Sequence, residues 1–258
     1  MKQGFWLVLV VGVIAAGCQF RQIPNPNDPN TVPADRQPIV VDAYMKQMSD
    51  DVIGPAKDIT PEQGRQLMVQ GAKDYLKTVH FKNTPPKLVW MVAEAYYTAN
   101  EWGRARQLFE QALTADTTPD RKVNDTLKLA RCQAELGDVD SAIRTARLAF
   151  QAPPEWKWPI LYAVYLEIVP AAERIKPSAR IELAHLVEDA IAQHEAATGT
   201  ISDAVRRAWV VTRRFHIGEA WNLVEKLYNA ANRPDLARAA ATKAAAKLQH
   251  SRANAIGR

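Results

Sequence analysis

The sequence predicts an all-α protein, and three observations support this. From Thr60 onward, segments of roughly 12–20 residues carry apolar side chains three and four positions apart, which is the spacing of an amphipathic helix. The pairs Thr60-Pro61, Thr84-Pro85 and Thr118-Pro119 each place a capping residue before a proline suited to a first helical turn. Gln63 completes a capping box with Thr60. We find no useful run of Val, Ile and Thr with a period of two, so strands are not expected.

The composition is that of a folded soluble chain. Its 258 residues are 47% hydrophobic and 24% charged, which excludes a wholly disordered chain and a polytopic membrane protein. The net charge of +5 is too mild to indicate nucleic acid, so we expect no nucleic-acid partner.

Residues 1–17 have the features of a signal peptide. Lys2 precedes an apolar run from Phe5 to Ala16. As a helix, this run would span about 18 Å, whereas a bilayer core is about 30 Å thick. A cleaved signal is therefore predicted, and not a membrane span.

A cysteine follows this run directly. Ala15-Ala16-Gly17-Cys18 resembles the bacterial lipobox, although Ala15 stands where that motif usually has leucine. The resemblance implies cleavage before Cys18, lipid on its thiol, and a membrane-anchored lipoprotein of the cell envelope. In that family, Asp after the cysteine is associated with inner-membrane retention. Gln19 here favours the outer membrane if the organism has one. An ordinary secretory signal with a chance cysteine is the alternative.

Residues 18–40 are predicted to form an extended tether before a helical body at 41–258. Proline fixes the backbone and removes N–H donors, so a stretch this rich in Pro and Asn is not expected to form a helix. At about 3 Å per residue, the tether could hold the body up to roughly 60 Å from a bilayer. A loop packed on the body is the alternative. The prolines are Pro24, Pro26, Pro29, Pro33 and Pro38.

The segments 85–117, 121–152 and 218–250 repeat one pattern. Each reads as two helices around a short turn, with small residues on both helices. The key alanines Ala105 and Ala142 are 37 residues apart. The positions that carry the pattern are Ala93, Ala105, Phe109 and Ala112, then Ala130, Ala142, Ala146 and Ala149, then Tyr228, Ala237, Ala241 and Ala244.

This pattern resembles the tetratricopeptide repeat (TPR). The resemblance implies a TPR-like solenoid of helical hairpins whose inner surface binds a protein or peptide. On that inner surface we expect Trp90, Glu94 and Tyr97, because they avoid the predicted packing positions. The hairpin within 153–200 departs from the pattern, since Glu167 and Pro170 stand where a small residue and an aromatic belong. It is either a degenerate repeat or a binding insertion.

Two further clusters need an interpretation. A stripe of four arginines is predicted on a separate helix from Ser202 to Phe215, either as a solvated face or as a docking site for an acidic peptide or anionic headgroups. An aromatic cluster is either packing between repeats or a binding patch. The arginines are Arg206, Arg207, Arg213 and Arg214, and the aromatic residues are Trp156, Trp158, Tyr162 and Tyr165.

The sequence contains no recognisable catalytic arrangement. His194-Glu195 begins like a zinc-protease motif, but Thr198 stands where the second histidine belongs. Cys132 lies among apolar residues and is predicted to be a buried, inert thiol. We therefore expect no catalytic residues, no metal site and no cofactor.

These observations lead to one functional hypothesis. The chain is expected to be a membrane-anchored TPR-like lipoprotein that acts as a protein–protein interaction scaffold in the cell envelope and is not an enzyme. The alternatives are a cell-envelope enzyme or its accessory subunit, and a ligand-binding lipoprotein that uses the aromatic patch.

Overall fold

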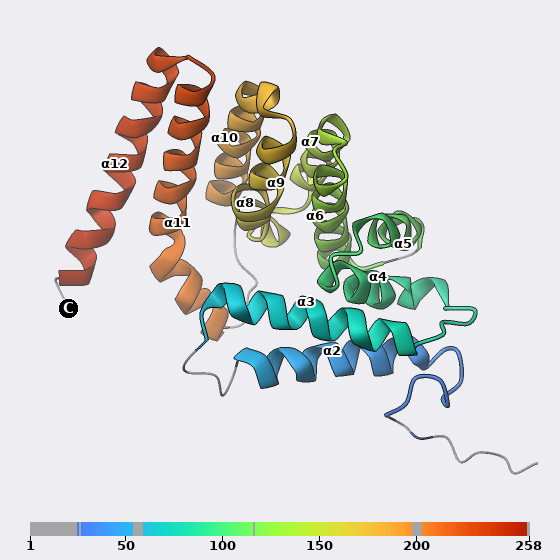
Figure 1. Ribbon diagram of the computed structural model, residues 1–258. Helices are drawn as coiled ribbons and strands as arrows, with labels where there is room; N and C mark the ends of the chain where they lie inside the picture. The colour runs from blue at the N-terminus through green and yellow to red at the C-terminus, as the bar shows by residue number, and fades with distance from the viewer. Residues whose placement is uncertain (1–24, 26, 54–58, 116, 198–202, 257–258) are drawn as a thin grey trace, which may run out of the picture.

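The computed structural model describes residues 25, 27–53, 59–115, 117–197 and 203–256 (Figure 1). These residues form helices and contain no strand, so the all-α prediction is confirmed. The helices are α2 (Gln37–Ile53), α3 (Pro61–Thr78), α4 (Val89–Thr98), α5 (Trp102–Thr114), α6 (Pro119–Glu135), α7 (Val139–Leu148), α8 (Ile160–Tyr162), α9 (Val169–Ile175), α10 (Arg180–Ala196), α11 (Asp203–Ala230) and α12 (Pro234–Ile256).

Helices that follow one another in the chain also pack on one another. α4 packs on α5, α5 on α6, α6 on α7, α10 on α11, and α11 on α12. In Figure 1, the pairs from α4 to α12 follow one another side by side in chain order. The helices α2 and α3 lie crosswise to them and pack on α4.

Three of the connections close with the same turn. Asn100, Gly137 and Asn232 have positive φ angles of 57°, 89° and 58° at the ends of α4, α6 and α11. In each turn, the next residue donates its N–H over 2.9 Å to the carbonyl five positions earlier, which is the Schellman bond. These bonds run from Glu101 to Tyr96, from Asp138 to Gln133, and from Arg233 to Tyr228. The segments 85–117, 121–152 and 218–250 thus share a turn geometry as well as a residue pattern.

Small residues lie where the helices of each pair approach. Ala93, Ala105, Ala130 and Ala142 are completely buried, as is Phe109. In the third segment the prediction was partly wrong. Ala237 and Ala244 are buried, but Ala240 is buried in place of the half-buried Ala241. Alanine at these positions lets two helix backbones lie close together.

The predicted helix starts have three different outcomes. The capping box of Thr60 and Gln63 is present in full. α6 begins at Pro119 as expected, although the Thr118 side chain makes no capping bond to the helix. The start at Thr84-Pro85 was wrong, because a short 3₁₀ turn (Pro86–Leu88) comes first and α4 begins at Val89.

Two helical segments in the C-terminal half differ from the prediction, one in its length and one in its hydrogen-bonding pattern. The helix predicted to end at Phe215 instead continues through α11 to Ala230, since Gly218 alone costs only about 1 kcal/mol in a helix interior. Between α8 and α9 the chain forms a π-helix, Ala163–Ile168. Pro170 explains this widening, because it cannot donate a helical hydrogen bond and its ring crowds the carbonyl four residues earlier.

The predicted linker is shorter than expected. α2 already begins at Gln37, with Pro38 in its first turn, where the missing N–H is not needed. Before it, Asn30 accepts a hydrogen bond from the His80 N–H (2.9 Å) and donates one to the Thr78 carbonyl (2.7 Å). The part of the linker that the structure describes is therefore packed on the body. Residues 1–24, with the predicted signal and Cys18, lie outside the described residues.

Candidate functional site

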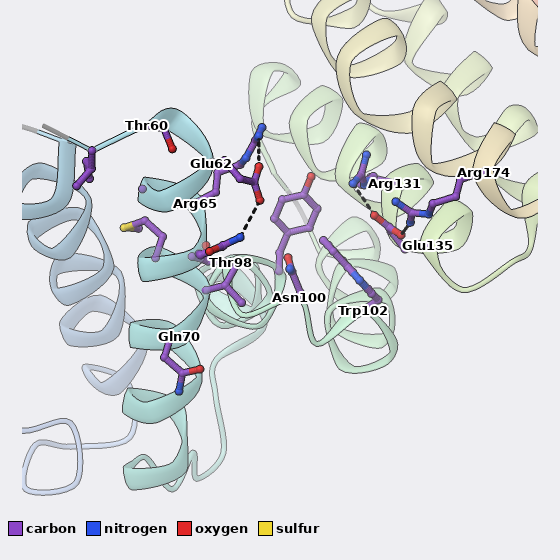
Figure 2. Close-up of a pocket in the computed structure, with 16 residues that line it drawn as sticks. Thr60, Glu62, Arg65, Gln70, Thr98, Asn100, Trp102, Arg131, Glu135 and Arg174 are labelled. Carbon is purple, nitrogen blue, oxygen red and sulfur yellow. Dashed lines mark hydrogen bonds and ion pairs between the residues drawn. The ribbon is translucent and has the colours of Figure 1, made fainter.

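A groove of about 1090 Å³ lies between α3 and the helices α4, α6 and α9 (Figure 2). We call it the central groove and define it by six of its lining residues. Two of its walls come from parts of the chain that are far apart in sequence. The six residues are Arg65, Tyr97, Trp102, Arg131, Glu135 and Arg174.

Two arginines on one wall share one carboxylate. Arg131 and Arg174 both form ion pairs with Glu135, which is itself nearly buried. Arg131 also donates to the backbone carbonyl of Glu167, whereas the Arg174 side chain is 63% exposed. Glu167 brings a second carboxylate to this wall, at Tyr97, so two guanidinium groups face two carboxylates, and the exposed Arg174 is the charge that a partner can reach.

The middle of the groove is aromatic. The Tyr97 ring meets the edges of Trp102 (centroids 5.3 Å apart) and Phe109 (6.1 Å). The Tyr97 hydroxyl donates to a Glu167 carboxylate oxygen over 2.6 Å. Burial and this nearby carboxylate both raise the pKa of Tyr97, so the phenol stays neutral. Arg131 lies over Trp102, with Cζ 5.7 Å from the ring centroid.

The opposite wall is the first half of α3. Glu62 forms an ion pair with Arg65 (2.5 Å) and accepts a hydrogen bond from Gln66 (3.2 Å). Hydrogen bonding to Arg65 and its charge lower the pKa of Glu62. This wall is therefore polar, and its one ion pair is electrically balanced.

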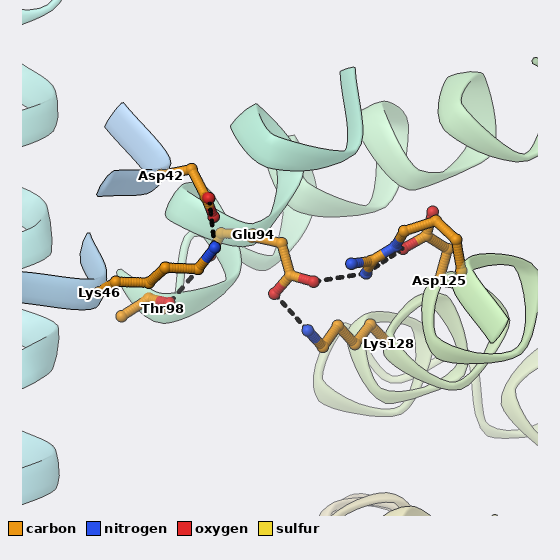
Figure 3. A network of polar contacts seen from close by, with 7 residues as sticks. Asp42, Lys46, Glu94, Thr98, Asp125 and Lys128 are labelled. Atoms are coloured by element: carbon orange, nitrogen blue, oxygen red, sulfur yellow. Dashed lines mark hydrogen bonds and ion pairs between the residues drawn. The ribbon is translucent and has the colours of Figure 1, made fainter. Parts of the chain in front are cut away.

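A second polar network links α4 to α6 (Figure 3). Glu94 accepts hydrogen bonds from Arg121 (2.6 Å) and from Lys128. Burial acts to raise the pKa of Glu94, but Lys128 and Arg121 outweigh it and hold that pKa below its usual value. Asp125 is 1% exposed and accepts from Arg121 over 2.5 Å, and burial raises its pKa. Arg121 also lies over Trp90, with Cζ 4.1 Å from the ring centroid.

The structure places the three residues predicted for the inner surface on α4. Tyr97 lines the central groove, Trp90 lines a smaller hollow of about 520 Å³, and Glu94 belongs to the network described above. All three are half-buried. Each makes contacts within the chain, so a partner would meet their edges and not freely projecting side chains.

Sequence reasoning missed much of the central groove. Arg131 and Glu135 form an i, i+4 pair on α6, which was visible as a spacing but carried no functional signal. Arg174 and Trp102 gave no signal at all. Glu167 did give one, because it broke the repeat pattern at a position now seen to contact both α4 and α6.

Only one of the four predicted arginines in the stripe has a described side chain. Arg213 donates to the backbone carbonyls of His194 (2.9 Å) and Glu195 (2.8 Å) at the end of α10. It therefore satisfies carbonyls at a helix C-terminus. The side chains of Arg206, Arg207 and Arg214 lie outside the described part of the structure.

The aromatic cluster is largely turned inward. Tyr165 is buried, and its hydroxyl lies 2.5 Å from Nδ1 of His216. Tyr162 is half-buried, with its ring against those of His194 (5.4 Å) and His216 (4.7 Å). Trp156 is also half-buried, against the main core. The contacts fit the packing interpretation better than an open binding patch.

Neither comparison with known proteins nor the search for a metal site assigns a function to these residues. No family model matches the sequence, and no curated protein matches it significantly. Among the described residues, no group of His, Cys, Asp and Glu has the arrangement of a metal site. Cys132 is buried as predicted, and burial raises the pKa of its thiol to about 12. In the same residues, no helix is long and apolar enough to cross a membrane.

Proposed function

We propose that the chain is a TPR-like solenoid that acts as a protein-binding scaffold, without an enzymatic activity or a cofactor. The three matching turns at Asn100, Gly137 and Asn232 support the repeat assignment, as do the buried alanines beside them. A helical hairpin cannot bury both of its faces alone, so stacking of neighbours is the expected solution.

The observation that carries the binding role is the central groove. It joins aromatic rings to guanidinium groups from several helices, and both residue types are enriched at protein–protein interfaces. Its volume of about 1090 Å³ suits a short protein segment. The exposed Arg174 favours a segment that carries a carboxylate near the α9 end.

We further propose that the body is held at a membrane of the cell envelope by lipid on Cys18. The basis is the apolar run that ends at Ala16 and the small residues before Cys18. The outer membrane is our choice if the organism has one. Mass spectrometry of the mature N-terminus tests this directly, and an unmodified Cys18 would contradict it.

Site-specific photo-crosslinking in cells tests the scaffold role. A photoreactive side chain at Gln66, on the α3 wall, should form an adduct with a specific protein. The matched control is the same side chain at Arg144, which is exposed on α7 and does not line the central groove. Equal adducts at both positions, or none at Gln66, would argue against the scaffold role.

A further inference from the structure

Few residues separate Cys18 from the part of the linker that the structure describes. From Cys18 to Asn25 there are only seven residues, which span at most roughly 25 Å even when fully extended. If Cys18 carries lipid, as proposed above, the body must lie close to the bilayer. The 60 Å reach expected from the sequence does not apply, because residues 27–36 are packed on the body.

Two side-chain amides fix the point at which the chain leaves the body. Asn30 pairs with the backbone of Thr78 and His80. Gln37 then donates to the His80 carbonyl (3.2 Å) and accepts from the Lys82 N–H (3.0 Å). The linker is thus held against the connection between α3 and α4, and Figure 1 shows both at the same end of the molecule.

The surface at this end is basic. Residues 75–93 contain no Asp or Glu, and Lys77, Lys82 and Lys87 are exposed within them. Asp74 pairs with Lys77 over 2.8 Å. On the adjoining linker, Arg36 is offset by Asp28 and Asp35. Asp28 and Asp35 exceed Arg36 by one negative charge, so the four cations and three carboxylates of this surface leave a net charge of +1, with Lys82 and Lys87 exposed on it.

A hollow adjoins this basic surface. It has a volume of about 520 Å³ and is lined by Lys87 and by Arg121, whose guanidinium group is already paired with Glu94 and Asp125. Thr117 and Thr118 add hydroxyl groups, although Asp120 also lies at its rim. Trp90 forms one side, and tryptophan is a residue that favours the headgroup region of membranes.

We propose that this surface, defined by Lys82, Lys87, Trp90 and Arg121, lies against the membrane and binds the anionic headgroups of phospholipids. The small number of residues between Cys18 and Asn25 brings it to the bilayer, and its two exposed lysines complement a phosphate-bearing surface. A basic residue near such a surface contributes about a fivefold gain in binding. The lipid would then orient the body as well as anchor it.

The test uses the lipidated full-length protein in vesicles of phosphatidylcholine alone or mixed with phosphatidylglycerol. An amine-reactive reagent that cannot cross the bilayer reports the exposure of each lysine by mass spectrometry. We expect Lys82 and Lys87 to react more slowly in the anionic vesicles. Lys82→Glu should speed the labelling of Lys87 at least about fivefold, because it weakens attachment to the surface. Lys226→Glu, at an exposed site on α11, is the matched control and should change nothing.

Each other outcome has a distinct meaning. Equal labelling in both vesicle types would overturn the headgroup proposal while leaving the lipid anchor and the scaffold role intact. Protection of Lys87 by inorganic phosphate alone, to the same degree, would overturn the membrane assignment in favour of a soluble anion. A mature protein without lipid on Cys18 would instead contradict the proposed function itself.

Discussion

The Tyr97 hydroxyl donates a 2.6 Å hydrogen bond to the Glu167 carboxylate, across 70 residues of chain. The backbone carbonyl of the same glutamate accepts from Arg131 on the intervening helix pair. One residue of the π-helix therefore touches α4 and α6 together. Glu167 breaks the repeat pattern, and the contacts that it makes set the position of two side chains in the central groove.

Glu167→Ala should destabilise the fold by about 1 kcal/mol, the usual net contribution of one hydrogen bond. Chemical denaturation measures the free energy of unfolding. Tyr97→Phe removes the same bond from the other side, so the double variant should be less destabilised than the sum of the two single variants. Strictly additive effects would show that the two residues are not coupled.

Stability should fall in mild acid because of His194. Burial first, and then the charge of Arg213, lower its folded pKa to about 4 from an ordinary 6.5. Between these values the unfolded chain binds the proton more readily, so stability is full above pH 6.5 and declines as the pH falls towards 4. The loss is at most roughly 3 kcal/mol.

The corresponding measurement is the free energy of unfolding as a function of pH. His194→Gln should flatten the slope in this window, whatever it does to stability at neutral pH. His80→Gln, at an exposed histidine, is the matched control for the substitution itself. A wild-type slope that survives in His194→Gln would assign the acid sensitivity to another group.

Two glycine substitutions should have opposite signs. Gly137 has φ +89°, which a side chain tolerates poorly, so Gly137→Ala should cost about 1 kcal/mol or more. Gly103 lies in the first turn of α5, and a Cβ there meets nothing within 4 Å. Gly103→Ala should therefore raise the melting temperature, since alanine favours a helix by up to about 1 kcal/mol. Two changes of the same sign would contradict the turn geometry.

The sequence predicts this fold well where the determinants are local. The turns at Asn100 and Gly137 and the alanines around them follow from residue type and spacing within one helix pair. The packing of the linker on the body was only the alternative, because Asn30 finds its partners 48 and 50 residues away, at Thr78 and His80. Proline content excluded a helix over 18–40, which holds for residues 27–36 and is wrong from Gln37 onward, and it could not show what the amides bind.

The candidate site was predictable only in part, for the same reason. Tyr97 was named because the repeat places it on α4 away from the predicted packing positions, although its ring packs on Trp102 and Phe109. The pairing of Arg174 with Glu135 joins positions 39 apart, and it depends on how α9 packs against α6. No spacing rule covers such a pair. Arg213 shows the opposite error. The arginine stripe was interpreted as a solvated face or a docking site, but this arginine binds backbone carbonyls at the end of α10.

The half-buried ion pairs of Glu94 and the exposed ion pair of Asp140 should differ sharply in their contribution to stability. Glu94→Ala removes a half-buried carboxylate from between Arg121 and Lys128, so Lys128 loses its partner and Arg121 keeps only Asp125. We expect a loss of about 2 kcal/mol in the free energy of unfolding, below the 3–5 kcal/mol known for fully buried pairs. Asp140→Ala is the matched control, because its pair with Lys176 (2.7 Å) is exposed on both sides and should contribute little to stability. Denaturation at low and high salt separates the two cases further, since salt should reduce the small effect of Asp140→Ala and leave that of Glu94→Ala nearly unchanged. Similar losses for both variants would mean that Glu94 is as well solvated as a surface residue.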